Sequence, residues 1–156
     1  MKPNYKIINQ TQESTCGMCV LAMIVNKPEQ YVLDWFKYID PPIGDEDAFI
    51  FLAHHGKYLA TCGMLKNQKT NKGVDISKID IISVEWPMIS ESYMVVDSET
   101  REDWSHAVFW TGKEVFDPLH KTPQPLSNYK VRYIYPIMHS IKPLIKKIGV
   151  LANGRI

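Results

Sequence analysis

The fold of this chain is decided by the stretch Gln10-Thr-Gln-Glu-Ser-Thr-Cys16-Gly-Met-Cys-Val-Leu-Ala-Met-Ile24. A glutamine and a short polar segment are followed by a strongly apolar run, and the change in residue type falls at Cys16. Ser14 or Thr15 could cap a helix that begins there. The apolar face predicted for this helix comprises Val20, Leu21, Met23 and Ile24. A cysteine at a helix start is favoured as a thiolate, because the helix dipole and unpaired N–H groups stabilise negative charge.

Two further helices are predicted in the first third of the chain. The first helix should stop before Pro28, because a residue that precedes proline avoids helical geometry. Pro28 fits the first turn of a second helix that runs to about Ile39. Asp45 opens a third helix, and Gly56 suits a left-handed cap at its end. The inner side of the second helix is predicted to carry Val32, Leu33, Phe36 and Ile39.

Short strands are predicted from Tyr58 onwards. The expected strands are Tyr58–Met64, Ile79–Trp86, Met88–Asp97, His106–Thr111, Glu114–Asp117 and Lys130–Ile134. Helices followed by antiparallel strands predict the α+β class, with a cleft between a helix and a sheet face. We expect one domain over residues 1–156, with a helical part at about 10–57, a sheet part at about 58–136 and a C-terminal helix or tail at 137–156.

A predicted hairpin brings two further polar residues together. Thr111-Gly-Lys113 is a credible hairpin turn, and the strands that it joins begin at His106 and end at Asp117. A nucleophile, a base and a group that orients the base are the parts of a thiol hydrolase. Cys16 would attack a carbonyl carbon, His106 would transfer the proton, and Asp117 would hold the imidazole. The sequence therefore predicts a Cys-His-Asp triad.

Three more residues are assigned roles around this triad. The Gln10 side-chain amide and the Cys16 backbone N–H would face the developing oxyanion. Gly17 would keep the start of the helix open to a substrate. Trp104 would form a wall of the cleft, although a role in packing the core or the hairpin is an equal alternative.

The Cys16-Gly-Met-Cys19 pair also fits two other classes of protein. A Cys-x-x-Cys motif at a helix start is typical of thiol–disulfide oxidoreductases, but there it follows a buried strand, and Asn9–Thr15 is polar here. A zinc site would need two more ligands at matching spacing; Cys62 and His54-His55 are available, but no second closely spaced pair is present. We therefore expect no metal and no cofactor, and a core position for Cys19.

The sequence resembles the bacteriocin-processing cysteine peptidases, papain-like domains that cut leader peptides after a double glycine. The matching segments are Gln10, Cys16-Gly17, Cys19-Val-Leu-Ala-Met23, Pro87-Met-Ile89, His106-Ala-Val108 and Asp117-Pro118. The resemblance spans about residues 8–120. It implies a papain-like fold in which Cys16, His106 and Asp117 form the triad and Gln10 lines the oxyanion hole. The family usually carries an aspartate directly before the cysteine, where this chain has Thr15.

Composition limits the partners and the compartment. Eighteen basic and 17 acidic residues leave a net charge of +1, which gives no electrostatic case for nucleic acid. Three cysteines cannot form a disulfide framework, and neither a signal peptide nor a membrane span is expected. The basic stretch from His139 to Arg155 is expected to form a docked amphipathic helix. We expect a cytoplasmic bacterial or phage protein that acts on a peptide or protein substrate.

Three functional hypotheses follow from these residues. The first is a cysteine peptidase that hydrolyses a peptide or isopeptide bond in an extended, Gly-containing segment through a thioester acyl-enzyme. In the second, the enzyme forms the same thioester with a protein glutamine. It then either deamidates that glutamine or transfers its acyl group to another acceptor. The third is a non-catalytic binding module on the same scaffold. The presence of a suitable residue at all four catalytic positions argues against this hypothesis.

Overall fold

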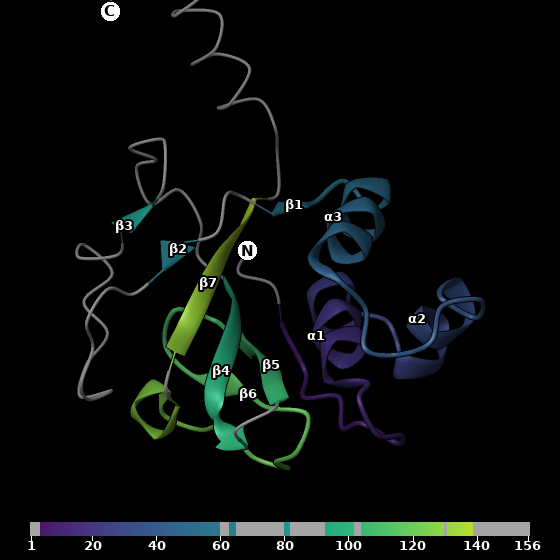
Figure 1. Cartoon of the computed structure of the whole chain (residues 1–156). Helices are drawn as coiled ribbons and strands as arrows, with labels where there is room; N and C mark the ends of the chain where they lie inside the picture. The colour runs from purple at the N-terminus through teal and green to yellow at the C-terminus, as the bar shows by residue number, and fades with distance from the viewer. Residues whose placement is uncertain are drawn as a thin grey trace, which may run out of the picture.

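The computed structural model describes residues 4–59, 63–64, 80–81, 93–101, 104–129 and 131–138 of the chain. Over these residues the protein is a mixed α+β structure, with three α-helices followed by an antiparallel sheet. Figure 1 shows the helices together on one side of the sheet. The α+β class and the order of helices before strands are therefore confirmed.

Helix α1 spans Cys16–Val25 and begins where the sequence predicts. Seven consecutive residues of α1, from Met18 to Ile24, are buried, so the whole circumference is covered and not only the predicted face. Thr15 occupies the N-cap position, but its side chain makes no capping hydrogen bond. Asn26, in the left-handed conformation at φ 55°, ends the helix before Pro28 as expected.

Helix α2, Glu29–Trp35, is shorter than predicted, whereas α3, Asp45–His54, has the expected start. The prediction that α2 reaches Ile39 is wrong, because the chain tightens after Phe36 into a turn in which the Ile39 N–H bonds the Phe36 carbonyl oxygen. Ile39 is consequently exposed, while Val32 and Phe36 are buried as predicted. Gly56 follows α3 at φ 69°, the left-handed conformation that glycine adopts without strain.

Seven strands form one antiparallel sheet in the order β3-β2-β7-β4-β5-β6, with β1 also paired to β7. The strands are β1 Tyr58–Leu59, β2 Gly63–Met64, β3 Asp80–Ile81, β4 Tyr93–Arg101, β5 Trp104–Trp110, β6 Val115–Phe116 and β7 Val131–Met138. A short 3-10 helix, Leu126–Asn128, precedes β7. The hairpin predicted between β5 and β6 is confirmed, with Phe109 paired to Phe116 and Trp110 to Val115.

Several predicted strand limits differ from the structure. Both ends of the strand predicted over Tyr58–Met64 are strand, as β1 and β2, and residues 60–62 between them lie outside the described residues. Only Asp80–Ile81 of the predicted Ile79–Trp86 strand lies in the described residues. The last strand continues past Ile134 to Met138, because Ile137 is buried in the core and pairs with Leu59. Residues 137 and 138 are therefore strand and not the start of a C-terminal helix. Residues 139–156, including the predicted amphipathic helix, lie outside the described residues.

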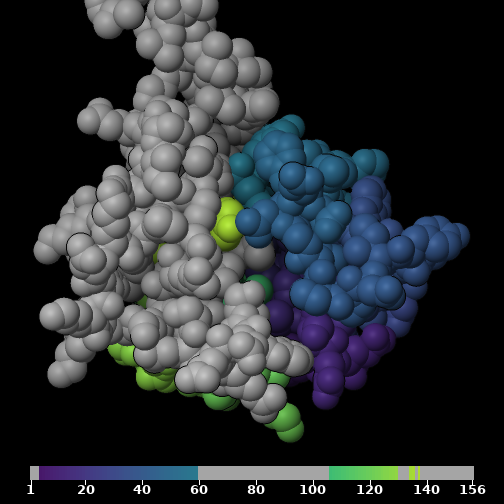
Figure 2. Space-filling model, in the orientation of Figure 1, coloured from purple at the N-terminus to yellow at the C-terminus, as the bar shows by residue number. Residues whose placement is uncertain are grey.

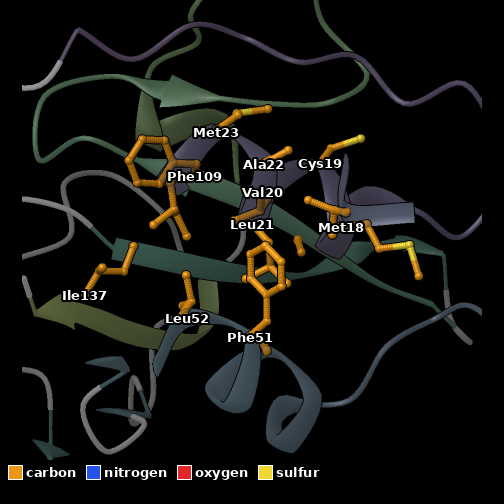
Figure 3. Packing of buried hydrophobic residues seen from close by; sticks show 14 of the residues in the cluster. Met18, Cys19, Val20, Leu21, Ala22, Met23, Phe51, Leu52, Phe109 and Ile137 are labelled. Atoms are coloured by element: carbon orange, nitrogen blue, oxygen red, sulfur yellow. The ribbon is translucent and has the colours of Figure 1, made fainter. Parts of the chain in front are cut away.

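The core lies between α1, α3 and the sheet. Figure 3 shows the buried side chains of α1 in one cluster with those of α3 and of the strands β5 and β7. The members labelled from the other elements are Phe51 and Leu52 of α3, Phe109 of β5 and Ile137 of β7. Helix α1 packs directly against β5, which places the start of α1 near the strand that carries His106. In the ranges given above, no helix combines the length and the apolar content needed to cross a membrane.

Candidate active site

Cys16 is the first residue of α1, where the polar segment from Gln10 gives way to the buried helix. Its side chain is partly buried against the apolar core. Because α1 packs on β5, the thiol faces the hairpin formed by β5 and β6. Figure 2 shows the N-terminal segment and the three helices, coloured purple to teal, forming one side of the surface.

His106 and Asp117 form a buried ion pair on the hairpin. His106 lies within β5, and Asp117 follows directly after β6. The His106 Nε2 atom is 2.7 Å from the Asp117 Oδ1 atom, and the two residues are 6% and 2% exposed. A hydrogen bond to Nε2 leaves Nδ1 as the ring nitrogen available to another partner.

Asp117 is held by more than the imidazole. Its Oδ1 atom accepts a hydrogen bond from the Leu119 N–H at 2.8 Å, and its Oδ2 atom accepts one from the Tyr129 hydroxyl at 2.7 Å. Burial alone would raise the pKa of Asp117, but the bonds from His106, Leu119 and Tyr129 outweigh it and lower the pKa. Asp117 is therefore a fixed carboxylate that is charged at neutral pH.

Cys16 and His106 interact closely enough for each to change the other's ionisation. Burial raises the pKa of the Cys16 thiol. His106 and the backbone N–H groups of Ala107 and Gly17 lower this pKa by more than burial raises it, so the pKa is below its ordinary value. For His106, burial lowers the pKa, whereas Asp117 and Cys16 raise it to about 9. These opposite shifts favour a thiolate–imidazolium pair, which is a stronger nucleophile than a neutral thiol.

Gln10 lies beside the Asp117 end of the hairpin. Its backbone N–H donates to the Pro118 carbonyl oxygen at 3.2 Å, and the Asn9 side chain donates to the same oxygen at 3.0 Å. The Gln10 Oε1 atom is buried and accepts no hydrogen bond from any residue that the structure describes. Buried polar atoms without partners are uncommon and call for an explanation such as a functional role. The role of Gln10 towards an oxyanion stays a prediction.

The structure describes the surroundings of only one of the two predicted substrate-binding residues, Gly17 and Trp104. A side chain added at Gly17 would meet Ile43, at 3.4 Å from its Cγ1 atom, which is ordinary contact. Gly17 thus faces the connection between α2 and α3, and its role at the opening to a substrate stays a prediction. Trp104 is the first residue of β5, but its side chain lies outside the described part, as does Cys62.

Cys19 occupies the core, as the sequence predicts, and also donates a hydrogen bond. Its Sγ atom is 3.4 Å from the Glu29 Oε1 atom. Burial and the neighbouring Glu29 carboxylate raise the pKa of Cys19, so this residue remains a thiol at neutral pH. Zinc binds cysteine as the thiolate, which this environment of Cys19 disfavours. Among the described residues, no group of three or more His, Cys, Asp or Glu side chains could hold a metal ion.

Glu29 and Tyr129 are polar residues of the site that the sequence interpretation did not identify. Glu29 accepts hydrogen bonds from Thr11 and Thr15, and Tyr129 donates to Asp117. An acidic residue directly after Pro28 fits the first turn of any helix, so its type gave no signal of burial. Tyr129 follows a loop whose path the sequence does not indicate.

Compared with known proteins, the chain matches no protein-family model and no curated protein sequence.

Proposed function

We propose that this protein is a papain-like cysteine hydrolase that cleaves a peptide or isopeptide bond. The observation that carries the proposal is the series Cys16, His106, Asp117: the imidazole is hydrogen-bonded to Asp117 at 2.7 Å, and it lowers the pKa of the Cys16 thiol while its own pKa is raised. Each residue is common alone. Their connection in this order, across a helix start and a hairpin, supplies the nucleophile, the base and its orienting group.

The proposed reaction proceeds in two steps. The Cys16 thiolate forms a bond to the substrate carbonyl carbon, and the His106 imidazolium gives its proton to the leaving amine, so that a thioester and a free amine result. A water molecule then loses a proton to His106 and attacks the thioester, and the carboxylic acid product leaves as Cys16 regains its thiolate form. Asp117 keeps the imidazole in the required orientation and stabilises its charged form.

The oxyanion of each tetrahedral intermediate needs fixed donors. The proposal assigns this role to the Gln10 amide group and the Cys16 backbone N–H. Such donors matter, since removal of one typically costs about 100-fold or more in kcat. The tie from Gln10 to Pro118 supports this assignment, since it holds Gln10 at the hairpin end next to Asp117.

The test is replacement of Cys16 with alanine. We expect wild-type protein to cleave members of an extended peptide library and to be alkylated at Cys16 by iodoacetamide, and C16A to lose the cleavage and the labelling at that position with its fold intact. Peptide mapping separates Cys16 from the other cysteines, and buried Cys19 is the internal control for a thiol that should react slowly. Cleavage by C16A at the wild-type rate would rule out the assignment. Conversion of a glutamine amide to an acid in an unbroken substrate would favour the deamidase alternative.

A further inference from the structure

Glu29 is a buried carboxylate that the proposed chemistry does not use. It is the first residue of α2 and is 7% exposed. A carboxylate loses its water on burial, so it requires several hydrogen-bond donors in compensation. Among the described residues, the groups that donate hydrogen bonds to Glu29 come from the segment that leads to Cys16 and from α1 itself.

These donors converge on both carboxylate oxygens. The Thr11 N–H lies 3.2 Å from each oxygen, and the Thr11 hydroxyl donates to Oε2 at 2.7 Å. The Thr15 hydroxyl donates to Oε1 at 3.0 Å, and the Cys19 Sγ atom lies 3.4 Å from the same oxygen. Burial raises the pKa of Glu29, but the Thr11, Thr15 and Cys19 hydrogen bonds together lower it, so Glu29 is charged at neutral pH.

The segment held in this way lies between two groups of the proposed oxyanion site. Residues 11–15 connect Gln10 to Cys16. At its start the segment is tied to the hairpin, through the bond from the Gln10 N–H to the Pro118 carbonyl oxygen. Along its length it is tied to α2 through Glu29. The position of Gln10 relative to the start of α1 therefore depends on both attachments.

Thr15 shows a further effect of this attachment. It is fully buried at the N-cap of α1, yet its hydroxyl does not cap the helix: its one proton is shared between the Gln12 carbonyl oxygen at 2.9 Å and Glu29 at 3.0 Å. A capping side chain would cover the first N–H groups of the helix. Since the Thr15 side chain is turned towards Glu29, it does not accept a hydrogen bond from the Gly17 or Met18 N–H, which an N-cap side chain would cover.

We propose that Glu29 is a positioning residue, which holds the Thr11–Thr15 segment so that the Gln10 amide and the Cys16 N–H face the same oxyanion. The inference rests on the proposed function and adds a residue to it. A carboxylate fits this task because both its oxygens accept hydrogen bonds, whereas the amide of glutamine would turn an NH2 group towards one set of donors. Glu29→Gln therefore keeps the size of the side chain and breaks the arrangement of bonds.

The experiment compares E29Q with D34N, a matched control that converts an exposed carboxylate of the same helix to an amide. The amount of active protein is set by alkylation of Cys16 with iodoacetamide, and kcat and KM are measured on the best peptide from the library. We expect kcat per alkylatable site of E29Q to fall about 100-fold, the loss that accompanies a displacement of reacting groups by ~1 Å. KM, the alkylation rate and all properties of D34N should stay near wild type.

A second pair of variants covers the case in which E29Q does not fold. Thr15→Val keeps the shape of a buried side chain and removes the hydroxyl that donates to Glu29, and Thr15→Ser keeps the hydroxyl. We expect T15V to lose kcat per site and T15S to retain most of it. A purely structural role of Glu29 predicts instead that E29Q and T15V lower the melting temperature and leave kcat per site unchanged, and that result would overturn the proposal.

Failure of the proposed function gives a different pattern. In that case the wild-type protein itself would show no cleavage of the library and no selective alkylation of Cys16. The positioning role would then be rejected together with the reaction. A wild type that cleaves and an E29Q variant with wild-type kcat per site would reject the positioning role alone.

Discussion

His106 is the residue through which the candidate site is connected, because it is hydrogen-bonded to the carboxylate of Asp117 and interacts electrostatically with the thiol of Cys16. Both partners stabilise its positive charge, and the charge in turn stabilises the thiolate. The ionisation of Cys16 and His106 is therefore coupled, and the pair titrates as a unit.

The first prediction at this scale concerns pH. The pKa of Cys16 is lowered and that of His106 is raised to about 9, so the thiolate–imidazolium pair exists above the lowered pKa of Cys16 and below the pKa of His106. We expect kcat/KM to rise as Cys16 loses its proton, at a pH below the pKa of an ordinary thiol. It should fall near pH 9 as the His106 imidazolium loses its proton. A rate that still rises above pH 9, as for a free thiol, would contradict this pairing.

The variant Asp117→Asn tests why the pKa of His106 is raised. Asp117 raises the pKa of His106, so its neutral replacement should move the fall on the alkaline side to lower pH. It should also lower kcat, because an amide does not fix the imidazole as a carboxylate does. Measurement of kcat/KM against pH in both proteins checks the shift, and an unmoved alkaline limb would count against Asp117 as the partner.

At the scale of single residues, sequence interpretation succeeded where residue type and chemistry coincide. Cys16, His106 and Asp117 could be proposed because a thiol, an imidazole and a carboxylate in that order match one kind of mechanism. Glu29 could not, because nothing in its neighbourhood distinguishes a buried acceptor from the exposed acid common at helix starts. Only the fold brings Thr11 and Thr15 to it.

At the scale of the element, the strongest sequence signals gave the most accurate predictions. The apolar run after Cys16 located α1, and Gly112, at φ 85°, lies in the turn predicted between β5 and β6. The predicted end of α2 was wrong, and β6 is limited to Val115–Phe116, which is shorter than the predicted Glu114–Asp117. A two-residue strand carries too few side chains for alternation to be visible, and it exists because a neighbouring strand offers it hydrogen bonds.

Gly56 offers a prediction about one element end. Its φ of 69° is strained for a residue with a side chain, but an added Cβ would meet nothing within 4 Å. The cost of Gly56→Ala is therefore conformational alone, and we expect a loss of about 1–2 kcal/mol in the free energy of unfolding. Gly56→Asn should lose less, because asparagine tolerates the left-handed region better. Chemical denaturation measures both, and an alanine variant as stable as wild type would refute the argument.

At the scale of the whole molecule, the candidate site depends on docking between the helical part and the sheet. Cys16 belongs to the first and His106 and Asp117 to the second. The two parts meet through the packing of α1 on β5 and through single polar contacts, such as the Tyr135 hydroxyl of β7, which donates to Asp45 of α3 at 2.7 Å. The sequence predicted both parts and their order. It could not predict these contacts, because residues 45 and 135 carry no mutual signal.

The contact between Tyr135 and Asp45 gives the prediction at this scale. Tyr135→Phe removes the hydroxyl and keeps the ring, so we expect a loss of about 1 kcal/mol in the free energy of unfolding. Tyr38→Phe is the matched control, because Tyr38 is 88% exposed, and it should be close to neutral. Since His106 and Asp117 lie on the β5–β6 hairpin and not on β7, the pH dependence of kcat/KM should keep its shape in Y135F. Equal stability of the two variants would show that this contact does not hold α3 to β7.

The separation of thiol and imidazole onto different parts of the chain makes Cys16 a natural reporter of assembly. A chain whose helices are formed but detached from the sheet would contain a cysteine of ordinary reactivity, since the imidazole and the Ala107 N–H would be absent from it. Circular dichroism would register such a species as nearly native. The rate at which an alkylating agent reacts with Cys16 would distinguish this species from the native protein. During refolding, the reactivity of this one sulfur atom would therefore report when the helical part and the sheet come together.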